Sequence, residues 1–226
     1  MNSLIRDRGL SLAAIVLLQA VVSVIQTSLS YTIAFGPLSG RSGLLEQISA
    51  GGFALRVALH ALSAVLWILN RKRALFRAIV IINAWFTFSL LLHTYFLFGV
   101  LLGKSAVAIE ALMLDVVLIA MSNILIFSIW YWVIDPPGVE ERQGADVPWE
   151  FLFPQRGGGV PYYESWVPRY ADYLYVAFTN SFAFSPTDAL PLSRRAKMLM
   201  LLQAVISVVT LTGIAGSAIN ILAGGR

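Results

Sequence analysis

Long apolar runs constrain the fold of this chain more than any other feature. A helix needs about 20 mostly apolar residues to cross a hydrocarbon core of about 30 Å. Five runs approach or exceed that length: Gly9 to Phe35, Gly52 to Leu69, Ala78 to Leu102, Ser105 to Ile134, and Lys197 to Leu222. The mean hydropathy is +0.77 and only 12% of residues are charged, against about a quarter in soluble domains. The sequence therefore predicts an all-α polytopic membrane protein with about five transmembrane helices.

The basic residues predict an orientation. They gather before the first run and between the second and third: Arg6, Arg8, Arg71, Lys72, Arg73 and Arg77. The opposite connections carry only Arg41 and Lys104. Because lysine and arginine are enriched in cytoplasmic loops, we expect a cytoplasmic N-terminus. The first run is longer than the 7 to 15 apolar residues of a signal peptide, so we expect it to remain as a helix.

The chain divides into three predicted regions. Residues 1–134 form a four-helix transmembrane region, residues 135–169 form a loop, and residues 170–226 form a re-entrant helix, a filter-like loop and the final helix. The loop is rich in Pro, Gly and aromatic residues: Pro136, Pro137, Gly138, Trp149, Phe151, Phe153, Tyr162, Tyr163 and Trp166. Pro and Gly disfavour a continuous helix, and aromatic side chains favour the headgroup level. We expect an ordered interfacial cap; a ligand site is the alternative.

The segment from Tyr170 to Phe184 is apolar but short. About 15 residues at 1.5 Å each give about 22 Å, less than the about 30 Å of the hydrocarbon core. We expect this helix to enter the bilayer partway, with an irregular return that protein or a wet cavity must cover. Ser193 is a suitable N-cap for the final helix. Together these elements predict a pore-loop hairpin.

The run Thr187, Asp188, Ala189, Leu190, Pro191, Leu192, Ser193 resembles the stretch that closes the selectivity filter of pore-loop potassium channels. The wider segment DYLYVAFTNSFAFSPTDALPLSRRAKMLMLLQAVISVVTL also resembles a group of uncharacterised bacterial integral membrane proteins. The resemblance covers about Asp172 to Asn220. It implies a bacterial inner-membrane protein that assembles as a homo-oligomer around a pore and conducts small cations.

The filter positions carry different residues from those of a potassium channel. Ser185, Pro186 and Thr187 stand in and around the positions where glycines let carbonyl groups face one axis. We therefore expect a filter that is not of the potassium type. Its candidate residues belong to the turn and the preceding helix: Thr179, Asn180, Ser181, Ser185, Pro186, Thr187 and Asp188.

Polar residues form a stripe along the last helix. They share one face at helical spacing and are pathway-lining candidates: Gln203, Ser207, Thr210, Ser217 and Asn220. Such a stripe faces either water or a neighbouring helix. The first helix has a matching stripe at Gln19, Ser23, Gln26 and Ser30, and Leu17 to Gln26 (LLQAVVSVIQ) matches Leu201 to Thr210 (LLQAVISVVT) at seven of ten positions. The match is either a coincidence or a sign of similar packing.

Ionisable residues also occur inside the predicted spans. They form a predicted intramembrane charge cluster: Arg56, His60, His93, Glu110 and Asp115. A buried charge in a bilayer is costly, so it should be paired or should face a cavity. Arg56 is the natural partner of Glu110 or Asp115. The two readings of the cluster are a structural ion pair and a route for protons or cations.

Signatures of catalysis are missing from the sequence. There is no cysteine, no H-E-x-x-H, no G-x-S-x-G and no P-loop, so we expect no enzyme activity, no cofactor and no metal site. The expected partners are the lipid bilayer, further copies of the chain, and small cations or protons, but not nucleic acid. The leading prediction is a pore-loop, channel-like protein. The alternatives are a proton-coupled transporter or sensor using Asp115, Glu110 and Arg56, and a non-conducting membrane scaffold.

Overall fold

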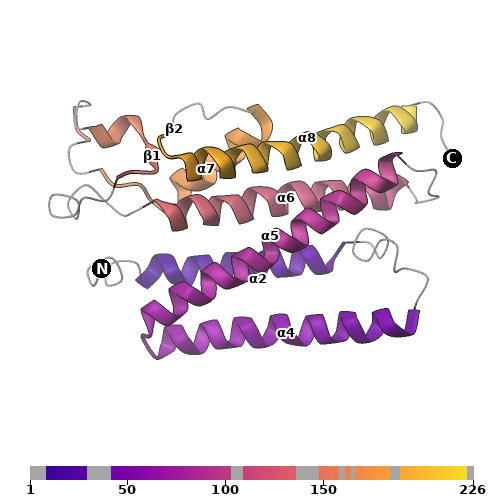
Figure 1. Ribbon diagram of the computed structural model, residues 1–226, viewed down its shortest axis with the longest axis horizontal. Helices are drawn as coiled ribbons and strands as arrows, with labels where there is room; N and C mark the ends of the chain where they lie inside the picture. The colour runs from indigo at the N-terminus through magenta and orange to yellow at the C-terminus, as the bar shows by residue number, and fades with distance from the viewer. Residues whose placement is uncertain are drawn as a thin grey trace.

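The computed structural model describes residues 9–29, 42–102, 109–135, 148–157, 161–163, 166–183 and 189–222. Within these ranges, the side chains of residues 9–10, 42–51, 102, 109–110, 157 and 217–222 are not described. The described part is almost entirely helical. Helices α2, α4, α6 and α8 run along the long axis of the molecule, and α5 crosses them obliquely (Figure 1).

The helix bounds agree closely with three of the predicted spans. The elements are α2 (Gly9–Thr27), α4 (Ser42–Ile68), α5 (Lys72–Leu102), α6 (Ile109–Ile134), β1 (Phe151–Leu152), the 3-10 helix η2 (Pro154–Gly157), α7 (Tyr170–Ala183), β2 (Leu190–Pro191) and α8 (Arg194–Leu222). The segment predicted as a short apolar helix is α7. Helices α5 and α8 begin in basic residues that precede the apolar runs, because hydropathy detects apolar residues and not the first helical turn.

Three helices are long and apolar enough to cross a membrane, over Lys72–Leu101, Ala111–Ile134 and Arg194–Gly216. The apolar stretches of α2 and α4 are shorter in the described residues, Ser11–Thr27 and Gly52–Ile68. The predicted count of about five spans is therefore not supported. Part of the first predicted run, residues 30–35, lies outside the description. Helix α4 begins ten residues before its apolar run, in a segment that contains Glu46 and Gln47.

A tight cap separates α4 from α5. The backbone N–H of Arg71 donates to the carbonyl of Leu66 (2.9 Å), and that of Asn70 donates to the carbonyl of Trp67 (3.0 Å). This pair of bonds is a Schellman motif. Its left-handed residue is Asn70, with φ 54°, and asparagine is one of the few residues other than glycine that adopts this conformation readily. The motif ends α4 sharply, so α5 starts at once at Lys72.

Helix α7 has a cap of its own. The backbone N–H of Arg169 donates to the carboxylate of Asp172 (2.6 Å). This is the reciprocal half of a capping box, and an acidic residue in the first turn also suits the positive end of the helix dipole. These contacts fix the start of α7 at Tyr170.

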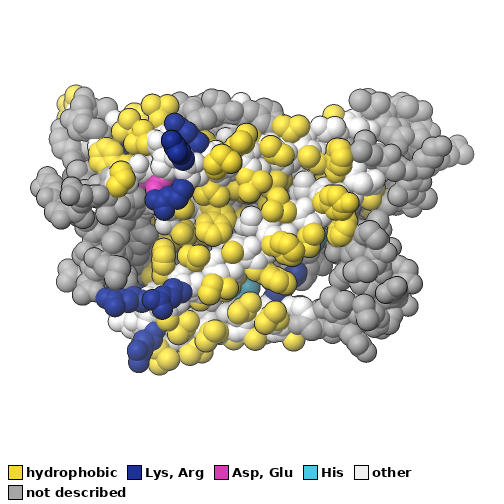
Figure 2. All heavy atoms as spheres, in the orientation of Figure 1, with side chains coloured by type: hydrophobic (Ala, Val, Ile, Leu, Met, Phe, Trp, Pro, Cys, Tyr) yellow, Lys and Arg dark blue, Asp and Glu magenta, His cyan; other side chains and the backbone are white. Residues whose placement is uncertain are grey.

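Helix α6 is the centre of the molecule. It packs against α2, α5, α7 and α8, whereas α4 packs only against α2 and α5 among the larger helix contacts. Figure 2 shows hydrophobic side chains across the face drawn and basic side chains towards its left side. Large apolar side chains are exposed on α4, including Phe53 (60%) and Ile68 (73%). This surface has the composition of one that faces lipid.

Candidate functional site

A buried hydrogen-bond network joins α6, α7 and α8 at Gln203. The side-chain Nε2 of Gln203 donates to the carbonyl of Ala177 and to the hydroxyl of Ser181, both at 2.8 Å. Its Oε1 accepts from the hydroxyl of Tyr131 (2.5 Å) and from Nδ2 of Asn180 (2.9 Å). Gln203 is fully buried. We call this set of side chains, together with Asn123 and Ser207, the Gln203 network.

The network continues along α8. Nδ2 of Asn123 on α6 donates to the hydroxyl of Ser207 (2.9 Å) and to the carbonyl of Gln203 (3.3 Å). Thr210 is buried, and its hydroxyl bonds carbonyls of its own helix. In this chain the stripe on α8 therefore packs against other helices at Gln203 and Ser207. The side chains of Ser217 and Asn220 lie outside the description.

The structure describes three of the predicted filter residues. Asn180 and Ser181 belong to the Gln203 network, and Asn180 also donates to the carbonyl of Met200 (3.0 Å). The hydroxyl of Thr179 bonds the carbonyls of Tyr175 and Val176 within α7. The remaining residues, Ser185, Pro186, Thr187 and Asp188, lie outside the described residues, so the predicted filter remains a prediction.

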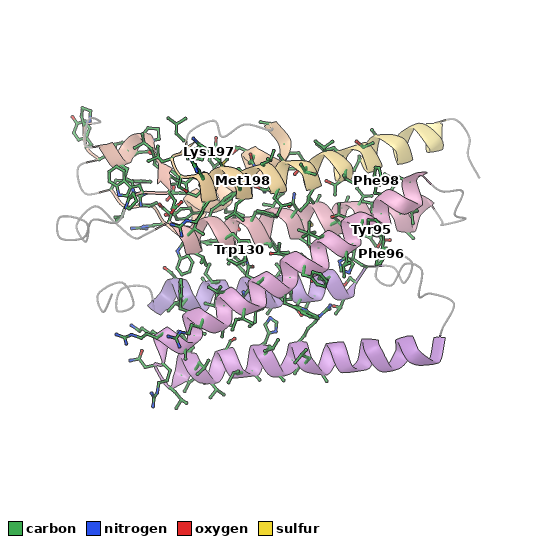
Figure 3. The ribbon with its side chains drawn as sticks, viewed as in Figure 1. Tyr95, Phe96, Phe98, Trp130, Lys197 and Met198 are labelled. Carbon is green, nitrogen blue, oxygen red and sulfur yellow. The ribbon has the colours of Figure 1, made fainter. Side chains whose placement is uncertain are left out.

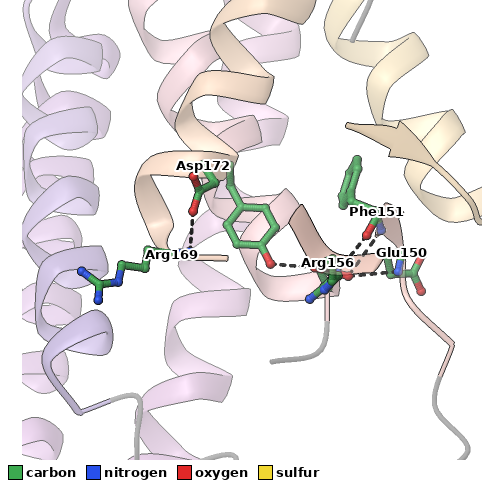
Figure 4. A network of polar contacts seen from close by, with 7 residues as sticks. Glu150, Phe151, Arg156, Arg169 and Asp172 are labelled. Atoms are coloured by element: carbon green, nitrogen blue, oxygen red, sulfur yellow. Dashed lines mark hydrogen bonds and ion pairs between the residues drawn. The ribbon is translucent and has the colours of Figure 1, made fainter. Parts of the chain in front are cut away.

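A second buried cluster centres on Asp135, just after α6 (Figure 4). Its carboxylate forms an ion pair with Arg156 (2.7 Å), and both side chains are 0% exposed. The same carboxylate accepts from the hydroxyl of Tyr173 (2.6 Å) and from the backbone N–H of Glu150 (3.0 Å). Arg156 also donates to the carbonyl of Phe151 (2.8 Å). The cluster thus fastens the loop to α6 and α7.

Glu150 fastens the same loop to α8. Its carboxylate accepts hydrogen bonds from Ser193 and from Arg195 (2.7 Å for Arg195), and its carbonyl accepts from the N–H of Leu192 (2.8 Å). The N–H of Ala196 donates to the hydroxyl of Ser193 (3.1 Å). This confirms the prediction that Ser193 caps the final helix.

The aromatic loop contributes buried rings to the core. Phe151 and Phe153 are 0% and 5% exposed. Phe151 packs edge-on against Tyr131 at 5.2 Å, and Phe153 against Tyr173 at 5.6 Å. Tyr162, by contrast, is 96% exposed. These phenylalanines therefore anchor the loop in the protein interior, where their apolar area is removed from water, and the interfacial position of the loop stays a prediction.

Another contact between α6 and α7 joins Ser128 to Tyr170. The two hydroxyl oxygens are 2.6 Å apart. Burial raises the pKa of the Tyr170 phenol to about 12, although the bond to Ser128 acts in the opposite direction. The phenol therefore stays protonated at neutral pH and serves as a structural hydrogen-bonding group.

Polar side chains also form hydrogen bonds between α2 and α5 and between α5 and α6. Gln19 and Gln26 on α2 donate to the carbonyls of Ile79 (2.9 Å) and Phe86 (3.1 Å) on α5. Between α5 and α6, Trp130 (Figure 3) donates from Nε1 to the hydroxyl of Thr87 at 2.8 Å. These side chains serve as links between helices, as expected for polar groups in an apolar bundle.

The matching ten-residue segments of α2 and α8 bury the same positions. Gln19 and Gln203 are both 0% exposed, and Gln26 and Thr210 are both 2% exposed. Each segment uses its first glutamine to bond a carbonyl of another helix. The stripe in the first helix also included Ser23, which is partly buried, and Ser30, which lies outside the description. The similarity thus extends from the letters to the way that both helices pack.

The predicted intramembrane charges divide between the helices. Arg56 and His60 lie on α4, His93 on α5 and Asp115 on α6, while the side chain of Glu110 is not described. His93 and Asp115 are 5% and 1% exposed. The helices that carry Arg56 and His93, α4 and α5, pack against each other. The expected Arg56–Asp115 ion pair does not form in the described part of the chain, where the ion pairs are Arg156–Asp135 and Arg195–Glu150.

Several buried polar atoms of this half of the bundle have no hydrogen-bond partner within the described residues. They are Nε of Arg56, Nε2 of His60, Nδ1 of His93, Oε1 of Gln26 and Oγ of Ser122. Buried polar groups are normally satisfied by protein, water or a ligand. The described residues contain no group of three His, Asp or Glu side chains that could hold a metal ion. These atoms are therefore among the polar groups of α2, α4, α5 and α6 that the described residues leave without a hydrogen bond.

Sequence reasoning overlooked the charged groups of the loop. Asp135, Glu150 and Arg156 were treated as loop residues, yet all three are buried and at most 2% exposed. The sequence contained a signal for these residues. Asp135 directly follows an apolar run, Glu150 lies between Trp149 and Phe151, and Arg156 is the next basic residue after Glu150.

Comparison of the chain with models of protein families, with curated proteins and with solved structures finds no match.

Proposed function

We propose that this chain is an integral membrane protein in which α2, α4, α5, α6 and α8 cross the bilayer. Support comes from the three helices that meet the length and composition of a span and from α2 and α4, which pack alongside them. The exposed apolar residues of α4 would face lipid. The basic residues near the starts of α5 and α8 would then lie on the cytoplasmic side, as the distribution of lysine and arginine predicts.

We further propose that the protein is a proton-coupled transporter or sensor. The observation that carries this proposal is the position of Arg56, which lies within α4, packed against the helix α5 that carries His93, and without a carboxylate partner among the described residues. Ionisable groups inside a membrane bundle are rare and usually mark a pathway. His93 and Asp115 would exchange protons, and Arg56 would set the local field. Glu110 belongs to the same helix as Asp115.

The channel-like function is the second candidate, and one observation favours it. Tyr173 near the start of α7 bonds Asp135 at the end of α6, and β2 after α7 pairs with β1 beside the same cluster. The chain thus enters and returns at one end, as a re-entrant hairpin does. In a homo-oligomer, Asp188 would then be the main candidate for contact with a cation.

Flux measurements distinguish these candidates. The full chain is reconstituted in liposomes that contain a pH-sensitive dye, and wild type is compared with Asp115→Asn, His93→Gln and Asp188→Asn. The transporter predicts proton movement that falls at least tenfold in Asp115→Asn and is unchanged in Asp188→Asn. Cation flux that depends on Asp188 alone would favour the channel instead. If wild type moves neither protons nor cations, the transporter and the channel both fail, and a sensor or a scaffold remains.

A further inference from the structure

The guanidinium of Arg56 lies deep along α4. At 1.5 Å per residue, it is about 18 Å from the end of the helix at Ile68. The neighbouring side chains Phe53 and Val57 are exposed and apolar (60% and 52%), whereas Arg56 is partly buried. A charged group at this depth in an apolar surface needs a counter-charge or water, because its transfer into hydrocarbon costs several kcal/mol.

The protein itself does not supply that counter-charge in the part that the structure describes. Both ion pairs found there use other basic residues, Arg156 and Arg195. Nε of Arg56 is buried without a hydrogen-bond partner in the same part of the chain. Asp115, the carboxylate that the sequence suggested, belongs to neither of these ion pairs. Among the described side chains, no carboxylate therefore pairs with Arg56.

Two histidine side chains, His60 and His93, lie on the helices that meet near this position. Nδ1 of His60 donates to the carbonyl of Arg56 (2.7 Å), since a carbonyl can only accept. His60 also lies against Phe86 of α5, with ring centroids 6.2 Å apart. Nδ1 of His93 is buried without a partner among the described residues, and His93 is 5% exposed. His60 lies about one turn after Arg56 on α4, and Phe86, which His60 contacts, lies about two turns before His93 on α5. Because α4 packs against α5, Arg56, His60 and His93 lie along the same interface between the two helices.

We propose that Arg56, together with His93, binds an oxyanion between α4 and α5. A carboxylate or phosphate group matches the planar fork of a guanidinium, which donates two parallel hydrogen bonds to such a group. The N–H of a neutral or protonated imidazole adds a third donor. Chloride has the charge but lacks the paired oxygens, so it should bind more weakly.

Arg56 and His60 are partly exposed on α4, so a ligand can approach this region from the surface of the helix. An oxyanion can therefore arrive from two sources, a lipid headgroup or a small solute. The inference rests on the proposed membrane location and not on proton coupling.

Binding to the purified full chain in nanodiscs tests the inference. In discs of neutral phosphatidylcholine, the protein is titrated with inorganic phosphate, acetate or chloride, and the thermal unfolding midpoint is followed. Phosphate or acetate should raise the midpoint more than chloride at equal ionic strength. Arg56→Gln should raise the dissociation constant at least tenfold, while Arg77→Gln, an exposed arginine on α5, should leave it unchanged.

A second arm distinguishes the sources. If the ligand is a headgroup, replacing part of the phosphatidylcholine by phosphatidylglycerol should stabilise wild type without added phosphate, and Arg56→Gln should abolish that shift. Arg56→Lys keeps the charge but loses the fork, so it should bind several-fold more weakly if Arg56→Gln does not fold. The inference is overturned if neither arm stabilises wild type, or if Arg77→Gln loses binding as much as Arg56→Gln. Proton flux is not measured here, so failure of this test leaves the transporter proposal intact.

Discussion

Nδ2 of Asn180 on α7 donates a hydrogen bond of 2.9 Å to Oε1 of Gln203 on α8. With the bonds to Tyr131, Ala177 and Ser181, the amide of Gln203 uses both of its donor hydrogens and both acceptor positions of its oxygen. A fully satisfied amide in a buried site rigidifies the helices that it joins. Helices α6, α7 and α8 should therefore behave as one unit.

Replacing Gln203 by Leu should lower the free energy of unfolding by about 2–3 kcal/mol, because four partner groups lose a hydrogen bond while remaining buried. Thr210→Val is the matched control on the same helix, since the hydroxyl of Thr210 bonds only carbonyls of α8, and it should cost less than about 0.5 kcal/mol. Denaturant unfolding in detergent micelles measures both. Equal losses would contradict a special role for Gln203.

Breaking the buried ion pair at the loop should be more costly. Asp135→Asn leaves the Arg156 charge buried and should destabilise the protein by about 3–5 kcal/mol. The double variant Asp135→Asn, Arg156→Met removes both charges and should recover most of that loss. Arg195→Gln is the control. The Arg195 side chain is 77% exposed, so this substitution should lower the free energy of unfolding by at most about 1 kcal/mol. A double variant no more stable than Asp135→Asn would argue against this explanation.

Close packing at Gly213 gives a third prediction. A Cβ atom added there would lie 3.1 Å from Cγ2 of Val116 and 3.4 Å from Cδ1 of Leu101. Gly213→Val should therefore separate α8 from α5 and α6 and cost about 1–3 kcal/mol. At Gly216 a Cβ atom would meet nothing within 4 Å, so Gly216→Ala should be neutral or stabilise by up to about 1 kcal/mol through helix propensity. Thermal unfolding of the two variants provides the comparison.

The start of α8 should depend on Glu150. Glu150→Gln weakens the bonds to Ser193 and Arg195, so the first turn of α8 should open more often. Hydrogen exchange at the amides of residues 194–198 should then become several-fold faster, while exchange in the middle of α8 stays unchanged. Exchange that accelerates equally along the whole helix would indicate global destabilisation instead.

Hydropathy predicted the apolar parts of the helices better than the polar segments that flank them. The end of α6 at Ile134 and the last helical residue of α8 at Leu222 agree with the predicted spans. The starts of α4, α5 and α8 lie before the predicted ones, because a helix can begin in polar and basic residues that hydropathy does not detect. The Schellman motif that ends α4 depends on the left-handed backbone conformation of Asn70. In the sequence, the asparagine itself is the one indication of this motif.

The polar contacts were harder to predict for a geometric reason. Helical periodicity places Gln203 and Ser207 on one face of α8, but it does not say which helix lies opposite. The partners Asn123 and Asn180 are 80 and 23 positions away in the chain, so the pairing depends on the tertiary arrangement. The same holds for Arg56, because Asp115, one of its two expected carboxylate partners on α6, forms no ion pair with it. The residue types predicted that polar side chains would pack between helices, whereas the tertiary structure determines which residues pair.

The bond between Glu150 and the start of α8 has a consequence for biosynthesis. Helix α8 begins with Arg194, Arg195 and Lys197, although the positive end of a helix dipole disfavours basic residues there. Glu150 precedes Ser193 by 43 residues, so it leaves the ribosome before the first turn of α8. The counter-charge is thus already present when the basic turn emerges. A nascent chain that ends before Ser193 lacks these partners of the carboxylate, and the contacts of α7 with α8 can form only after α8 has been synthesised.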